Sequence, residues 1–164
     1  MSKTEKNLQD AFAGESQANR KYLAFAKKAE AEGFKQAAKL FRAAAASETI
    51  HAHNHLRELG VVKSTRENLM AAINGESYEF QNMYPRMIAD AQAEENPGAL
   101  RSFNLANAVE KIHAALYQKA LDSLGRNADT EYYVCSVCGY TAEGAAPDEC
   151  PVCGAKKQAF RKVE

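Results

Sequence analysis

The sequence has no tryptophan, no formal net charge and no cysteine before position 135. It also has no apolar run approaching the roughly 20 residues that a membrane-spanning helix needs, and its first residues lack the apolar core of a signal peptide. The 21 basic and 21 acidic residues form no dominant basic run, so charge gives no reason to expect binding to nucleic acid or an anionic membrane. We therefore expect a cytoplasmic protein with neither of these partners.

What the sequence does contain is a repeated pair of short motifs. A Glu-x-x-His motif occurs twice, and each copy follows a Gly-Glu-Ser motif. The residues concerned are, in chain order, Glu15, Glu48, His51, Glu76, Glu110 and His113. The interval from the first Gly-Glu-Ser glutamate to the second is one residue shorter than the interval between the Glu-x-x-His glutamates. Two motifs repeated nearly in register indicate an internal duplication of a helical hairpin.

Apolar residues recur every three or four positions through four segments, as on one face of an amphipathic helix. We predict helices from Thr4 to about Glu32, from Phe34 to Leu59, from Thr65 to the Asn96-Pro97-Gly98 breaker, and from there to Leu124. Thr65 is the expected N-cap of the third helix, and Pro85 is expected to kink it. The predicted fold is mainly α, a four-helix bundle over residues 1–128 followed by a small cysteine-containing domain over residues 129–164.

The predicted inward faces of these helices carry five glutamates: Glu15, Glu48, Glu76, Glu79 and Glu110. Glutamate is rarely buried unless it is paired, and five close carboxylates repel one another. Two divalent cations would offset both costs. A single glutamate more often pairs with Lys or Arg or lines a solvated surface, but the doubled Glu-x-x-His favours a metal site. The ligand set resembles that of ferritin-like di-iron and di-manganese proteins.

The two repeats differ at one position, where Glu79 in the second corresponds to Ala18 in the first. An extra carboxylate would let one metal change ligands between redox states, because carboxylate oxygen suits ferric iron and imidazole suits ferrous iron. Tyr22 stands seven residues after the first Gly-Glu-Ser glutamate, and Tyr84 stands eight after the second. These two tyrosines are expected either to hydrogen-bond into the site or to belong to the bundle core.

The four cysteines form two Cys-x-x-Cys-Gly motifs, one at Cys135 and Cys138 and one at Cys150 and Cys153. In a reducing compartment this pattern favours one tetrahedral metal site over two disulfides. The glycine after each second cysteine lets backbone amides turn toward the sulfurs. The spacing does not choose between structural zinc and redox iron.

Taken together, the motif order resembles the rubrerythrin family, with a ferritin-like bundle followed by a rubredoxin-like domain. The resemblance implies a non-haem di-iron peroxidase that reduces hydrogen peroxide to water. It implies two irons in the bundle, with or without an oxo bridge, and one iron in the four-cysteine site. The implied partners are an NAD(P)H-linked reductase or rubredoxin as electron donor, and a second copy of the chain in a homodimer, with helices retained or exchanged.

The resemblance also implies a role for each ligand. Glu48 and Glu110 would bridge the two irons, Glu15 would bind one of them, and Glu76 with His113 would bind the other. Glu79 and His51 would alternate on the first iron as it changes oxidation state. No ligand position departs from the family pattern.

Two rival functions use the same residues. A ferritin-like ferroxidase needs the same bundle site, although iron oxidation requires an electron acceptor and the cysteine module suits a donor. A metal-binding or interaction protein with a structural zinc ribbon predicts a colourless tail.

Overall fold

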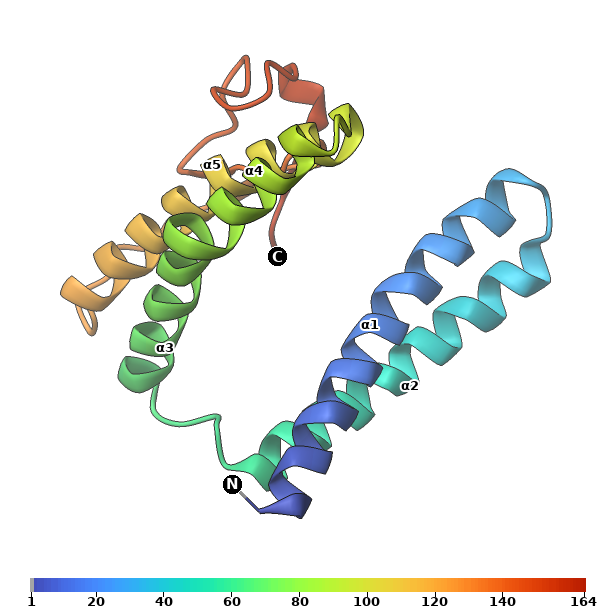
Figure 1. Cartoon of the computed structure of the whole chain (residues 1–164). Helices are drawn as coiled ribbons and strands as arrows, with labels where there is room; N and C mark the ends of the chain where they lie inside the picture. Colours follow the sequence, from blue (N-terminus) through green and yellow to red (C-terminus); the bar gives the residue numbers. More distant parts are fainter. Residues whose placement is uncertain (1) are drawn as a thin grey trace. The chain divides into compact units, whose positions relative to one another are not determined.

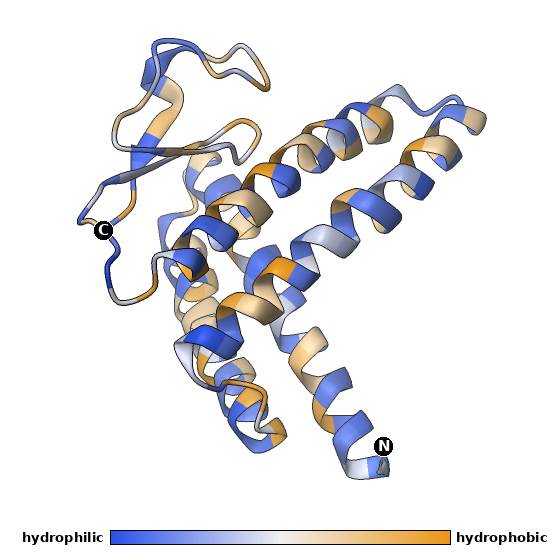
Figure 2. Cartoon of the chain, turned by 90° about the vertical axis from the view of Figure 1, so that its left-hand side faces the viewer, coloured by the Kyte–Doolittle hydropathy of each residue, from blue (hydrophilic) through white to orange (hydrophobic). Residues whose placement is uncertain are grey.

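The structure, a computed structural model, describes residues 2–164 and consists of long helices followed by a small β-containing module (Figure 1). The chain forms two compact units, one ending at Lys63 and the other beginning at Ser64. Hydrophilic and hydrophobic residues alternate along the helices, as expected for helices with one apolar side (Figure 2).

The first unit is a hairpin of two helices, α1 (Lys3–Ala31) and α2 (Lys35–Leu59). A capping box starts α1, in which the Ser2 hydroxyl accepts from the backbone N–H of Glu5 and the Glu5 carboxylate accepts from that of Ser2. The turn between the helices contains Gly33 at φ 85°, a left-handed conformation that costs glycine little. These local signals set the ends of the hairpin within a residue or two of the prediction.

Small side chains form the seam between α1 and α2. The fully buried residues of the hairpin are all alanines, namely Ala26, Ala29, Ala38, Ala45 and Ala52. Alanines at these positions let the two backbones approach closely. The burial is specific in register, since Ala37 is exposed and Ala44 half-buried, while their neighbours Ala38 and Ala45 are buried. The Glu-x-x-His motif of α2 consequently flanks the seam and does not lie within it.

The second unit begins with three helical segments and one long helix: α3 (Thr65–Tyr78), η1 (Glu79–Met83), α4 (Tyr84–Ala93) and α5 (Pro97–Asp122). The N-cap of α3 is Ser64, not Thr65 as predicted, because Ser64 has the Ser-x-x-Glu spacing to Glu67 that a capping box requires. Asn96 caps α5 by accepting from the backbone N–H of Ala99 at 3.0 Å. The predicted breaker therefore separates α4 from α5.

The η1 segment is a π-helix, which the sequence analysis did not predict. The backbone N–H of Tyr84 donates to the carbonyl of Glu79, five residues earlier, in place of the usual four. Pro85 follows directly, and because proline has no N–H it cannot continue the normal pattern. The expected disturbance at Pro85 thus appears as a π-turn just before it.

The module after α5 contains a three-stranded antiparallel sheet in the order β2-β1-β3. Its elements are β1 (Tyr132–Cys135), β2 (Thr141–Glu143), the 3₁₀ turn η2 (Lys157–Ala159) and β3 (Phe160–Lys162). The sheet positions the first cysteine motif, because β1 ends at Cys135 and β2 starts three residues after Cys138.

The predicted fold class is confirmed, since the chain is mainly helical, has the four long helical stretches of a ferritin-like bundle and ends in a small four-cysteine domain. Within residues 2–164, none of the helices combines the length and apolar character that crossing a membrane requires.

Candidate metal centres

Among the described residues, three groups of side chains present metal-ligand atoms within 4.8 Å of one another. The groups are Glu15 with Glu48 and His51, Glu76 with Glu110 and His113, and the four cysteines Cys135, Cys138, Cys150 and Cys153. Each of the two repeats thus assembles one Glu-Glu-His triad, and the tail assembles a four-thiol group.

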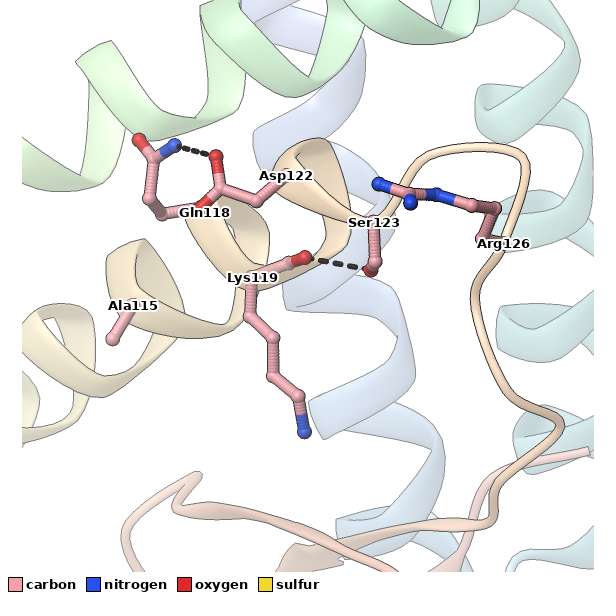
Figure 3. Close-up of a pocket in the computed structure, with 6 residues that line it drawn as sticks. All are labelled: Ala115, Gln118, Lys119, Asp122, Ser123 and Arg126. Carbon is pink, nitrogen blue, oxygen red and sulfur yellow. Dashed lines mark hydrogen bonds between the residues drawn. The ribbon is translucent and has the colours of Figure 1, made fainter.

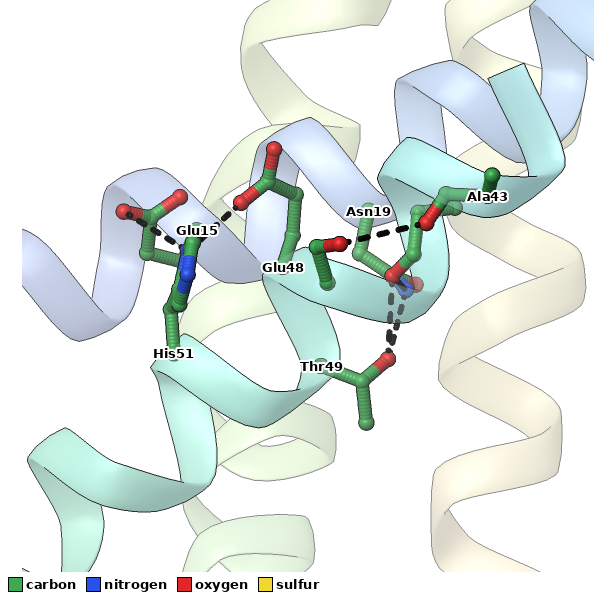
Figure 4. Close-up of polar contacts among 8 residues, drawn as sticks. Glu15, Asn19, Ala43, Glu48, Thr49 and His51 are labelled. Carbon is green, nitrogen blue, oxygen red and sulfur yellow. Dashed lines mark hydrogen bonds and ion pairs between the residues drawn. The ribbon is translucent and has the colours of Figure 1, made fainter. Parts of the chain in front are cut away.

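The first triad lies on α1 and α2. His51 Nδ1 is 2.9 Å from a carboxylate oxygen of Glu48 and 3.9 Å from one of Glu15 (Figure 4). One turn further along α1, the Asn19 amide donates to the carbonyl of Ala45 at 2.7 Å and to the hydroxyl of Thr49 at 2.9 Å. These two bonds fix α1 against α2 beside the triad.

The second triad lies on α3 and α5. His113 Nδ1 is 2.8 Å from a carboxylate oxygen of Glu110. Burial, a hydrogen bond with Glu110 and the charge of that carboxylate raise the pKa of Glu76 to about 7. Two carboxyl groups that share a proton in this way are held close together against their mutual repulsion. A divalent cation would take the place of that proton, so the residues fit a metal site.

Glu79 stands at the start of η1, outside the tightly grouped ligand atoms of the second triad. Burial, followed by the charge of Glu110, raises its pKa. Tyr84 lies near the same carboxylates, because burial and the charges of Glu79, Glu110 and Glu76 raise the pKa of its phenol. The ring of Tyr22, in contrast, packs among aromatic side chains, with its centroid 6.3 Å from that of Phe41.

The four cysteines have the geometry of a tetrahedral metal site. The sulfurs of Cys135 and Cys153 are 3.7 Å apart, and those of Cys138 and Cys150 are 3.6 Å apart. Four thiolates at about 2.3 Å from a central ion stand about 3.8 Å from one another. The sulfurs therefore enclose a space that suits one ion.

The two cysteine loops repeat the same backbone turn. The N–H of Gly139 donates to the carbonyl of Cys135, and the N–H of Gly154 donates to that of Cys150, both at 2.9 Å. Both glycines have positive φ, 86° and 73°, so a side chain there would be strained. Burial opposes ionisation of the Cys135 thiol, but hydrogen bonds from backbone N–H groups and from the Cys153 and Cys138 thiols together outweigh burial and lower its pKa.

One residue near the second triad was missed by the sequence analysis. Thr141, the first residue of β2, lies with its Oγ1 3.0 Å from His113 Nε2. Nothing in the motif spacing identifies this contact, because it depends on how the module packs on α5. Lys119 of α5 also forms an ion pair with Glu143 of β2.

A surface pocket at the end of α5 carries none of the predicted ligands. Its lining residues are Ala115, Gln118, Lys119, Asp122, Ser123 and Arg126 (Figure 3). The hydrogen bonds drawn among them are local to the helix, between Gln118 and Asp122 and between Ser123 and the carbonyl of Lys119. This pocket offers no cluster of reactive groups.

The candidate ligands occur in a chain that matches known families over most of its length. Residues 6–121 match the family model described as rubrerythrin, and residues 133–161 match that of the rubrerythrin rubredoxin-like domain. The chain is 39% identical to rubrerythrin-2 of Clostridium acetobutylicum, with 94% of this chain and 93% of that protein covered. It is 37% identical to nigerythrin of Nitratidesulfovibrio vulgaris, with 96% and 85% covered.

Solved structures give the same relationship. The partially reduced state of nigerythrin superimposes with a TM-score of 0.61 and 35% identity, over 99% of this chain and 88% of that one. The fully reduced, all-ferrous state of nigerythrin gives a TM-score of 0.61 and 34% identity. The two Glu-Glu-His triads and the four-cysteine group therefore occur in a fold that solved proteins share.

Proposed function

This chain belongs to the rubrerythrin family, and we propose that it is an oxidoreductase that reduces hydrogen peroxide to water. The carboxylate and histidine ligands of its bundle and the four cysteines of its rubredoxin-like domain fit iron. The observation that carries this proposal is the presence, in one chain, of two Glu-Glu-His triads and a four-thiol group with tetrahedral spacing. A two-electron reduction needs both a reacting metal pair and an electron supply, and these groups offer both.

The proposed ligand roles follow the two triads. Glu48 and Glu110 would bridge the irons, Glu15 would bind the first iron, and Glu76 with His113 would bind the second, whether the two triads come from one chain or from two. The side chains of both bridging candidates expose only 17% of their surface, which supports ligation by buried carboxylates.

Glu79 and His51 are proposed to alternate on the first iron. Glu79 stands outside the tight triad and begins a π-helical segment, where the backbone pattern departs from that of a regular helix. The His51 side chain is 52% exposed, twice the value of 26% for His113. Both observations support two ligands that are less tightly held than the other five.

When bound, the iron pair would supply the two electrons that cleave the peroxide O–O bond, and the four-cysteine iron would return them. Of the chain's own residues, Tyr84 offers an acid group for water formation, because burial and the nearby carboxylates raise the pKa of its phenol and keep it protonated. We propose that Tyr84 orients peroxide or donates a hydrogen bond to it, whereas Tyr22 supports the site through packing.

The proposed partners are an NAD(P)H-dependent reductase or rubredoxin as electron donor, and a second copy of the chain. Apolar side chains that stand exposed on α2, among them Leu40 and Ile50 at 69% and 60%, support a subunit interface on that helix. We place the protein in the cytoplasm, where reducing conditions keep four thiols available to a metal. Light scattering of the metal-loaded chain should give the mass of a dimer.

The experiment that tests the function is anaerobic reduction of the iron-loaded protein followed by one equivalent of hydrogen peroxide. The visible band of the four-cysteine iron should return rapidly, and faster than with air. A Glu48→Gln variant with normal thiolate iron is the matched control and should lose the fast phase. Absence of an iron–thiolate band would favour the structural zinc ribbon. A band that does not change on addition of peroxide would favour the ferroxidase.

A further inference from the structure

His113 is held from two sides by residues that lie far apart in the sequence. Its Nδ1 faces the Glu110 carboxylate at 2.8 Å, and its Nε2 faces the Thr141 hydroxyl at 3.0 Å. Glu110 precedes it by one helical turn on α5, whereas Thr141 begins β2 of the cysteine module. A candidate ligand of the bundle therefore depends on a residue of the cysteine module for one of its two polar contacts.

The geometry also gives the direction of these bonds. The Thr141 hydroxyl has a single proton, and the carbonyl of Gly139 lies 3.4 Å away to accept it. The oxygen of Thr141 then accepts from His113, so the imidazole proton sits on Nε2. With a cation bound among the carboxylates, this tautomer would leave the Nδ1 lone pair free to bind it.

The module is docked on α5 by further contacts on both sides of this bond. Lys119 forms an ion pair with Glu143 two residues beyond Thr141, and Gly139 lies beside the Val109 side chain, which a Cβ at Gly139 would meet in ordinary van der Waals contact at 3.8 Å. Val109 itself is only 2% exposed. The hydroxyl is therefore presented to His113 by a packed contact.

The histidine of the first repeat has no equivalent support within its own unit. Among residues 2–63, the hydrogen bond and ion pairs of His51 all involve Nδ1, with Glu48 and Glu15, and its Nε2 has no partner. The two repeats thus have the same candidate ligands, but their two histidine side chains differ in their hydrogen-bonding partners.

We propose that Thr141 is a positioning residue that fixes the tautomer and orientation of His113, and so couples metal binding in the bundle to docking of the cysteine module. The inference rests on that part of the proposed function which makes His113 a metal ligand. Linkage makes the coupling reciprocal, so docking of the module strengthens the His113 site and metal at that site strengthens docking. Thr141 thereby keeps His113 as a constant ligand while His51 remains free to exchange.

The first test is ¹⁵N NMR of histidine side chains in the full-length, zinc-loaded protein. His113 should show the Nε2–H tautomer with a slowly exchanging proton. Thr141→Val keeps the volume and strand preference but removes the hydroxyl, and it should speed exchange of that proton severalfold, while Thr141→Ser should restore slow exchange. An unchanged His113 signal in Thr141→Val would overturn the proposal.

The second test is the affinity of the bundle for ferrous iron, measured anaerobically with a competing chelator. Loss of a hydrogen-bonding partner behind a metal-bound histidine typically costs about 10-fold or more in affinity, so Thr141→Val should weaken the tighter-held iron by roughly that factor. Lys119→Met removes a docking contact without touching His113, so the proposed coupling predicts that it weakens iron binding in the wild type but not in a Thr141→Val background. If it weakens binding equally in both backgrounds, the coupling bypasses the Thr141 hydroxyl and the proposal fails.

These readouts separate the inference from the proposed function. If peroxide fails to reoxidise the wild-type protein but Thr141→Val still changes the His113 signal and iron affinity, the function is wrong and the positioning role stands. If peroxide turnover is fast and both readouts are indifferent to Thr141, the function stands and the positioning role is wrong. The iron–thiolate band of each variant shows that its module has folded.

Discussion

The shared proton of Glu76 and Glu110 predicts an unusual pH dependence for the metal-free protein. Glu76 has a pKa of about 7 in the folded chain, against 4.5 for an unperturbed glutamate. Between these pH values the unfolded chain has lost the proton that the folded chain retains, so stability falls as pH rises through this window. Salt-bridged carboxylates act in the opposite direction and at lower pH, because their folded-state pKa values are lowered and their stability is gained as pH rises toward the unfolded value.

The size of this effect follows from the change in pKa. If Glu76 were shielded from solvent, the change in its pKa from 4.5 to about 7 would lower the free energy of unfolding by about 3 kcal/mol as pH rises through this window. Glu76 is only partly buried, so solvent screening reduces the expected loss to about 1 to 2 kcal/mol. Iron or zinc should abolish the loss, because the cation replaces the proton, and metal uptake at pH 6 should release protons.

Urea unfolding of the metal-free, reduced chain between pH 5 and pH 7.5 tests this prediction. Circular dichroism of the helices provides the signal, since the sequence has no tryptophan for fluorescence. Glu76→Gln carries no ionisable group at that position, so subtracting its pH profile isolates the contribution of Glu76. Identical profiles for the wild type and Glu76→Gln would refute the shared proton.

Three further predictions follow from the ligand groups and from one cap. Glu79→Ala should slow peroxide turnover about 10-fold or more and leave the metal content largely intact, as measured by inductively coupled plasma emission spectroscopy. Loss of the metal pair would instead make Glu79 a structural ligand. Cys138→Ser should abolish the iron–thiolate band and steady-state turnover with a reductase, yet a chemically reduced bundle should still consume one equivalent of peroxide. Ser64→Ala should cost about 1 kcal/mol of unfolding free energy through loss of the α3 capping box, whereas Thr65→Ala should cost much less.

Local signals in the sequence were sufficient for the main features of the fold. The Asn96-Pro97-Gly98 breaker and the glycine at position 33 mark helix ends because their conformational preferences act within a few residues. The motif pattern likewise identified the residues that the structure groups into two triads and a four-thiol cluster. Repeated helical spacing brings such residues onto one face, whatever the packing around them.

What could not be predicted depends on packing between elements. Ala37 and Ala38 have the same side chain, so only contact with α1 decides which of them is buried. Thr141 was missed because its role depends on the docking of a separate module. The N-cap of α3 was placed one residue late, although the Ser-x-x-Glu spacing from Ser64 was available in the sequence.

The π-helical segment η1 accounts for the unequal intervals between the repeated motifs. In a regular helix, at about 100° per residue, eight residues would turn Tyr84 about 80° away from Glu76, whereas Tyr22, seven residues after Glu15, stands within about 20° of it. A π-turn takes up one extra residue, and η1 lies between Glu76 and Tyr84. Tyr84 is thereby returned to the position that Tyr22 holds in the first repeat.

The second repeat therefore carries a one-residue insertion, and the π-turn accommodates it so that Glu76 and Tyr84 stay on the same face of the helix. Glu79 lies at the start of this turn, at the position that Ala18 holds in the first copy. A duplication that began with two equal halves would thus need two changes, a single inserted codon for the place where the helix deviates and a substitution for the carboxylate that its sister copy lacks.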